Sequence, residues 1–130
     1  MRKFILLACL LLSLTACQES MEKRAARDAR ETTEKRCPMP LGNDGKIVLE
    51  RIDFDIPTLT WCQHYLLNAL PDEGPLNQTE ARRLLLDELK NSPNYQPYMD
   101  NGFIFQYIYC RMSEPHDTLL NLKLGPTDYR

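Results

Sequence analysis

The chain has 130 residues, with 16 basic and 18 acidic side chains and a formal net charge of −2 at pH 7. This length allows one small domain, and the near balance of charge excludes the concentrated basic face of a nucleic-acid-binding protein. The sequence has no glycine-rich phosphate loop, no G-x-S-x-G elbow and no H-E-x-x-H motif, which are common signatures of catalytic sites. We therefore expect a protein that is not an enzyme and carries no cofactor.

The first seventeen residues have the pattern of an export signal. Two basic residues precede an apolar run at 4–12, which is too short to span a membrane but has the size of a secretory signal peptide. The following L-T-A-C at 14–17 resembles the lipobox of bacterial lipoproteins. The resemblance implies that residues 1–16 are removed, that the Cys17 thiol carries diacylglycerol, and that the new amino terminus is acylated.

Such an anchor would hold the protein to a membrane through lipid rather than through charge. Stable anchoring needs more than one acyl chain. After cleavage 14 basic and 18 acidic residues remain, because Arg2 and Lys3 are lost, and the net charge is near −4. Gln18 follows the anchor, where an aspartate would signal inner-membrane retention in enteric bacteria. We expect a lipid-anchored protein of the bacterial cell envelope, at the outer membrane, with the membrane face left open.

Residues 18–36 are predicted to be a charged tether. The segment has eleven charges of both signs and no aromatic residue, a composition that cannot bury a core. Two acidic and basic pairs at i,i+4 spacing allow partial helix, so a small partner-binding helix is the alternative. The predicted organisation is a signal peptide at 1–16, a lipidated cysteine and tether at 17–36, and a globular domain at 37–130.

Turn residues and hydrophobic periodicity divide the domain into five elements. Prolines at positions 38 and 40 prevent the preceding block from continuing as helix. The predicted elements are a strand at 46–54, a strand at 58–67, a helix from Asn77 or Thr79 to residue 90, a strand at 103–112 and a strand at 118–124.

Alternation on two of these strands separates an aromatic face from a mixed one. Trp61 and Tyr65 alternate with His64 on the second strand, and an aromatic row alternates with smaller residues on the third. The row is Phe103, Phe105, Tyr107 and Tyr109. The simplest fold is α+β with two layers, in which one helix packs on a four-stranded, mainly antiparallel sheet in the order ββαββ.

The opening Cys37-Pro38-Met39 with Gly42 resembles small lipoproteins of gut Bacteroidales. Those proteins have a charged tether, this Cys-Pro-Met start and a strand–strand–helix–strand–strand body. The resemblance implies an envelope location and the α+β fold, and it implies no catalytic residue.

Three cysteines of the domain, Cys37, Cys62 and Cys110, are candidates for a disulfide bond. Exported domains meet an oxidising compartment, and an odd number leaves one thiol over or paired between molecules. A Cys62–Cys110 bridge requires neighbouring strands with Cα atoms within about 7 Å. A bridge from Cys37 to either, or no bridge, remains open.

The same residues allow a different hypothesis. Cys62 and His64 are alternate residues of one strand, so their side chains share a face. With Cys110, Cys37 or His116 they could bind a metal ion, or the thiol could act as a nucleophile with a histidine base.

The aromatic face is most simply core, but its tyrosines would form a binding platform for a peptide or a sugar if no helix covered it. The favoured function is therefore a lipid-anchored, non-enzymatic accessory or binding module whose partner is an envelope protein or a glycan. The alternative is a metal- or thiol-dependent protein that uses Cys62, His64 and Cys110.

Overall fold

The computed structural model describes residues 19–68 and 76–130. The predicted signal peptide and the predicted lipidation site Cys17 lie outside the described residues. The elements in chain order are α2 (Met21–Arg36), β1 (Met39–Leu41), β2 (Ile47–Asp55), β3 (Thr60–Leu67), α3 (Gln78–Lys90), the 3-10 turn η1 (Pro93–Tyr95), α4 (Gln96–Asp100), β4 (Ile104–Arg111), β5 (Thr118–Leu124) and α5 (Pro126–Tyr129). Within those ranges, no helix combines the length and the apolar character needed to cross a membrane.

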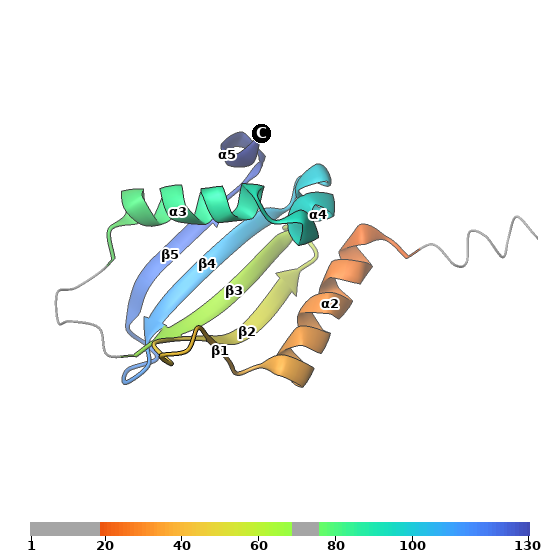
Figure 1. Ribbon diagram of the computed structural model, residues 1–130. Coiled ribbons are helices and arrows are strands. Elements are labelled where there is room, and N and C mark those ends of the chain that lie inside the picture. The colour runs from red at the N-terminus through yellow and green to blue at the C-terminus, as the bar shows by residue number, and fades with distance from the viewer. Residues whose placement is uncertain (1–18, 69–75) are drawn as a thin grey trace, which may run out of the picture.

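A single five-stranded sheet with the strand order β1-β2-β3-β4-β5 organises the molecule. β3 and β4 pair in parallel, and the other neighbours are antiparallel. The parallel pair needs a long crossover, and α3, η1 and α4 lie in it. Figure 1 shows α3 crossing β4 and β5, with α4 at one end of the sheet.

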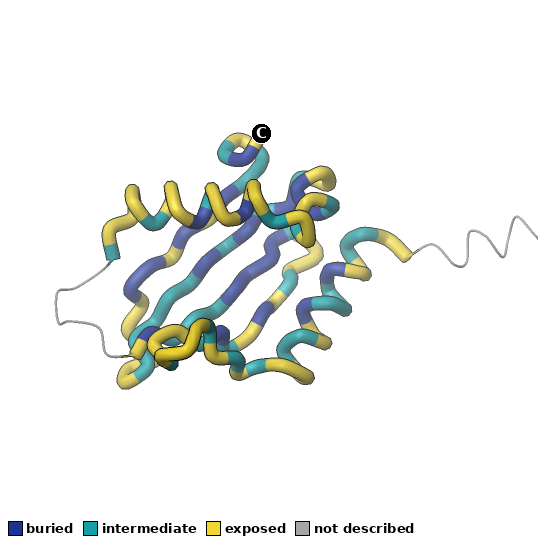
Figure 2. Tube along the Cα trace, viewed as in Figure 1, coloured by how far each residue is buried: buried dark blue, intermediate teal, exposed yellow. Residues whose placement is uncertain are grey.

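The core lies between the sheet and these helices. Figure 2 shows buried residues along β3, β4 and β5 and on the sheet side of α3. The largest fully buried side chains are Phe103, Phe105, Leu89 and Leu124. The predicted aromatic row is therefore mostly core, and α3 contributes the predicted apolar stripe through Leu89 and Leu85.

Four predicted strands and the predicted helix are confirmed, with small shifts of their ends. Alternation placed the correct residues on each face because β-strand side chains alternate with period two. α3 begins where a cap was expected, since the Asn77 side chain accepts a hydrogen bond from the Glu80 N–H at 3.1 Å. It ends at Lys90, with Asn91 as the C-cap two residues before Pro93.

The predicted strand count and the ββαββ order are incomplete. A fifth strand, β1, pairs with β2 and contains Pro40. The prolines were interpreted only as ending a helix, and proline is tolerated on an edge strand because no ladder hydrogen bond is needed on the outer side. The predicted mainly antiparallel sheet also contains one parallel pair, and the segment after α3 forms η1 and α4 rather than irregular chain.

The predicted tether is helical and packs on the domain. Residues 21–36 form α2, whose Ala25 and Ala29 are buried in the core cluster. Because alanine has a small side chain, this largely charged helix can approach the sheet closely. The prediction that residues 18–36 contribute nothing to a core is wrong for these two alanines. The folded unit therefore begins before Cys37.

Thr33 of α2 completes the edge of the sheet. Beyond β1, the outer side of β2 presents the N–H and C=O of Ile52. The Thr33 hydroxyl accepts a hydrogen bond from the Ile52 N–H at 2.9 Å and donates one to its carbonyl at 3.0 Å. At this residue α2 satisfies both groups of an edge that would otherwise be open to strand pairing.

Candidate functional site

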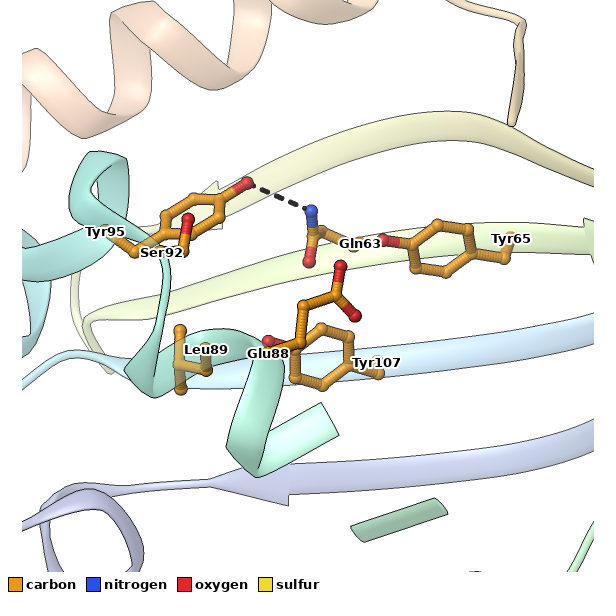
Figure 3. Close-up of a pocket in the computed structure, with 7 residues that line it drawn as sticks. All are labelled: Gln63, Tyr65, Glu88, Leu89, Ser92, Tyr95 and Tyr107. Carbon is orange, nitrogen blue, oxygen red and sulfur yellow. Dashed lines mark hydrogen bonds between the residues drawn. The ribbon is translucent and has the colours of Figure 1, made fainter. Parts of the chain in front are cut away.

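The helix-covered face of the sheet contains a cleft beside α3. Its lining residues come from β3, β4, α3 and η1 (Figure 3), and they are Gln63, Tyr65, Glu88, Leu89, Ser92, Tyr95 and Tyr107. The cavity volume is about 90 Å³. Pockets for whole small ligands usually measure about 300–1,000 Å³, so this cleft fits the end of one side chain rather than a complete substrate.

The parallel pairing of β3 and β4 builds the floor of the cleft. Gln63 lies beside Tyr107, and Tyr65 lies beside Tyr109, in the register of the two strands. The rings of Tyr65 and Tyr109 stack with centroids 4.6 Å apart and an interplanar angle of 11°. Because these residues alternate with period two, all four side chains face the helices.

The wall of the cleft comes from α3 and the turn after it. Glu88 belongs to the last turn of α3, and Ser92 lies in the connection between α3 and η1. Tyr95 closes the end of the cleft, where its hydroxyl accepts a hydrogen bond from the Gln63 amide at 3.2 Å. Leu84, one turn before Glu88, is 53% exposed and extends the wall with an apolar surface.

The tyrosines of this region are held in their neutral form. Burial raises the pKa of Tyr65, Tyr95 and Tyr107, and the negative charge of Glu88 contributes in the same direction. Burial and Glu88 also raise the pKa of Tyr109 to about 12. These hydroxyls are therefore hydrogen-bonding groups at neutral pH and not general bases.

Cys62, His64 and Cys110 lie on the opposite face of the sheet. Cys62 is beside Gln106, while Cys110 is beside Leu66 in the same parallel ladder. Four residues of strand separate the two cysteines, about 13 Å along the strand, which exceeds the reach of a disulfide bond. The candidate Cys62–Cys110 bridge, one of the alternatives left open, is therefore not formed.

Cys37 does not reach either partner. It precedes β1, which is separated from β3 by all of β2, a distance of about 10 Å across the sheet. All three thiols of the described domain are free. The disulfide expected for an exported domain is absent from residues 19–68 and 76–130, because the strand order keeps the cysteines apart.

His64 is paired with a carboxylate that sequence reasoning did not connect to it. Its Nε2 lies 3.0 Å from Asp53 Oδ2 on β2. Burial and the nearby Arg51 charge lower the pKa of His64 despite the opposing effect of Asp53. Burial, reinforced by Asp53, raises the pKa of the Cys62 thiol to about 11.

The raised pKa of Cys62 and the separation of the two cysteines disfavour the metal- or thiol-dependent alternative built on Cys62, His64 and Cys110. A nucleophilic cysteine needs a lowered pKa, and Cys62 has a raised one. The described parts of the chain contain no group of three histidine, cysteine, aspartate or glutamate residues placed to hold a metal ion. Cys110 is too far along its strand to complete such a set with Cys62.

Sequence reasoning found Tyr65 and Tyr107 of the cleft but missed its other polar residues, among them Gln63, Glu88 and Tyr95. Gln63 lies between Trp61 and Tyr65 in the same alternation, which could have placed it on the inner face. No local sequence pattern identifies Glu88 as a residue of the cleft, because its position there depends on where α3 crosses the sheet. Tyr95 was assigned to an irregular connection.

The comparisons with known proteins agree with this architecture. Residues 20–120 match the family described as a domain of unknown function (DUF8479), and the chain belongs to this family. The match includes α2, so this helix is part of the family domain. No curated protein matches the chain.

Three solved structures share the fold at low sequence identity. The first is the pilotin EpsS of the Vibrio vulnificus type 2 secretion system, with a TM-score of 0.62, 11% identity and coverage of 84% of this chain and 91% of that one. The second is a protein of Pseudomonas aeruginosa, with a TM-score of 0.65, 13% identity and coverage of 87% and 100%. The third is the type II secretion system pilotin AspS of Vibrio cholerae, with a TM-score of 0.58, 10% identity and coverage of 82% and 90%.

Proposed function

We propose that the chain is a non-enzymatic, lipid-anchored accessory protein of the bacterial envelope, which binds a protein partner at the cleft beside α3. The anchor is the lipid on Cys17, and the membrane is the outer membrane. The role corresponds to that of a secretion-system pilotin, which is the class named for two of the three similar structures.

The observation that carries this proposal is the fold likeness over most of both chains. The likeness spans 84% of this chain and 91% of the Vibrio vulnificus pilotin. The cleft supports it independently. A cavity of this size beside the exposed Leu84 suits one anchoring side chain of a larger partner surface.

A protein partner fits the cleft better than a glycan does. Sugar rings bind by packing on open aromatic faces, and here Tyr65 and Tyr109 stack on each other. The floor residues Tyr107 and Gln63 are 6% and 7% exposed. What remains accessible is the mouth of the cleft and the exposed Leu84 of α3, which suit a peptide segment.

The lipid anchor is tested by the intact mass of the protein extracted from membranes. We expect the loss of residues 1–16 together with the added mass of acyl chains, and the Cys17→Ser variant should leave the membrane fraction. A processed mass without acyl groups would refute the anchor.

The binding surface is tested by photocrosslinking in the native host. A photoreactive amino acid at position 84 lies next to the cleft, and one at position 123 lies on the opposite face, where Lys123 is exposed. We expect position 84 to give a discrete crosslink to an envelope protein and position 123 to give none. Equal crosslinking from both positions, or none from either, would contradict the proposal.

A further inference from the structure

The cleft is acidic and has no positive charge of its own to balance it. Glu88 forms no ion pair with any residue of the described chain. Two basic residues of the same helix are engaged elsewhere: Arg82 pairs with Asp128 at 3.1 Å and Arg83 with Glu80 at 2.6 Å. The third, Lys90, lines a different pocket together with Asp100 and Tyr129. Glu88 is therefore available to a charge supplied from outside.

Groups that can accept hydrogen bonds line the same cleft as this carboxylate. The Gln63 amide nitrogen donates to Tyr95, which fixes the amide, and Figure 3 shows its oxygen on the side that faces Glu88. The hydroxyls of Tyr65 and Tyr107 add oxygen atoms at the same cleft. A carboxylate, an amide oxygen and phenolic oxygens accept hydrogen bonds, and a guanidinium or ammonium group has only donors to offer.

The aromatic rings favour the same class of group. A cation placed over the face of a tyrosine is attracted by the ring electrons, and the attraction grows when water is excluded. The cavity of about 90 Å³ accommodates the end of a long side chain and its charged head. Burial is the main reason for the raised pKa of the four tyrosines, and the contribution of Glu88 to each places its negative charge at the same cleft.

From these observations we propose that the cleft is a recognition pocket for the cationic end of an arginine or lysine side chain of the protein partner, with Glu88 as its counter-ion. This inference rests on the proposed function, since the side chain belongs to the partner bound beside α3. Charge complementarity then decides which partner segments dock: a basic residue would need to project from an otherwise apolar surface that covers Leu84.

The test uses the purified chain and a small probe, N-acetyl-arginine amide, followed by the NMR signals of the tyrosine rings. The uncharged N-acetyl-citrulline amide has nearly the same shape and serves as the matched probe. We expect saturable shifts at Tyr65 and Tyr107 with the arginine probe and at least tenfold weaker binding of the citrulline probe. Equal binding of the two probes would overturn the proposal.

Two variants separate the role of Glu88 from a general change of charge. Glu88→Gln keeps the shape and removes the counter-ion, and we expect at least tenfold weaker binding of the arginine probe. Asp87→Asn makes the same change of charge at the neighbouring exposed position, and we expect it to weaken binding of the arginine probe by less than twofold. Both positions are exposed, so both variants should fold, and equal effects would contradict the inference.

The crosslink from position 84 distinguishes this inference from the proposed function. If Glu88→Gln lowers the crosslink yield and Asp87→Asn does not, both proposals are supported. If the crosslink forms equally well in Glu88→Gln, the partner binds without the pocket and this inference is wrong while the function stands. If spermidine binds more tightly than the arginine probe and no crosslink forms, the occupant is a free polyamine, and the assignment to a partner's side chain is overturned.

Discussion

Replacing Thr33 by valine should detach α2 from the edge of the sheet without changing the shape of the side chain. Threonine and valine are nearly isosteric and have similar helix propensities. The change removes the two hydrogen bonds to the backbone of Ile52, which measure 2.9 and 3.0 Å. It leaves an N–H and a C=O in a partly buried position without a protein partner.

The expected cost is about 2 kcal/mol of the free energy of unfolding. Each hydrogen bond contributes a net of about 0.5–1.5 kcal/mol, and an unsatisfied buried group costs about 1–3 kcal/mol. We take the lower part of the combined range because the sites are only partly buried. With a urea m-value of about 2 kcal/mol/M, the unfolding midpoint should fall by about 1 M.

Urea unfolding followed by circular dichroism measures this difference, and the chain offers a matched control. Thr32→Val makes the same change one residue away, where the described structure shows no side-chain hydrogen bond, and it should stay within about 0.5 kcal/mol of the parent. Thr33→Ser keeps the hydroxyl and should lose less than about 1 kcal/mol. If Thr33→Val unfolds at the same urea concentration as Thr32→Val, the hydrogen bonds to Ile52 do not hold α2 in place.

Three further predictions concern the stability of the fold. Asn77→Ala removes the cap on the Glu80 N–H and should cost about 1 kcal/mol in urea unfolding, whereas Asn77→Asp should restore most of it. Burial raises the pKa of Cys62 from 9.0 to about 11 and that of Tyr109 from 10.0 to about 12. As the pH rises, the unfolded chain therefore releases these protons before the folded protein does. The free energy of unfolding should be highest below pH 9 and should fall between pH 9 and 12. Unchanged stability across that range, with tyrosine ionisation at 295 nm near pH 10 in the folded protein, would contradict this. The pKa of His64 is lowered by burial, so the unfolded chain binds a proton first and stability should decrease as the pH falls below about 6.5, an effect that His64→Gln should reduce.

The elements themselves followed from local sequence. Alternating residues such as Trp61, Tyr65 and His64 were assigned to the correct faces, because a strand's two sides are defined by its own residues. Asn77 and Pro93 marked the ends of α3 by backbone chemistry alone. The export signal and the lipid on Cys17 also rest on local sequence, and they stay predictions.

The sequence did not determine which segments meet. Residues 18–36 were interpreted as a charged tether, because nothing in that segment shows that Ala25 and Ala29 will be buried. The surface against which α2 packs belongs to β2, a separate element of the chain. Two cysteines on neighbouring strands were compatible with a bridge until the parallel register of β3 and β4 set them four residues apart. Glu88 belongs to the cleft only because α3 crosses the sheet at that point. Local periodicity decides the shape and face of each element, but pairing and packing join residues far apart in the chain, and only the tertiary structure decides those.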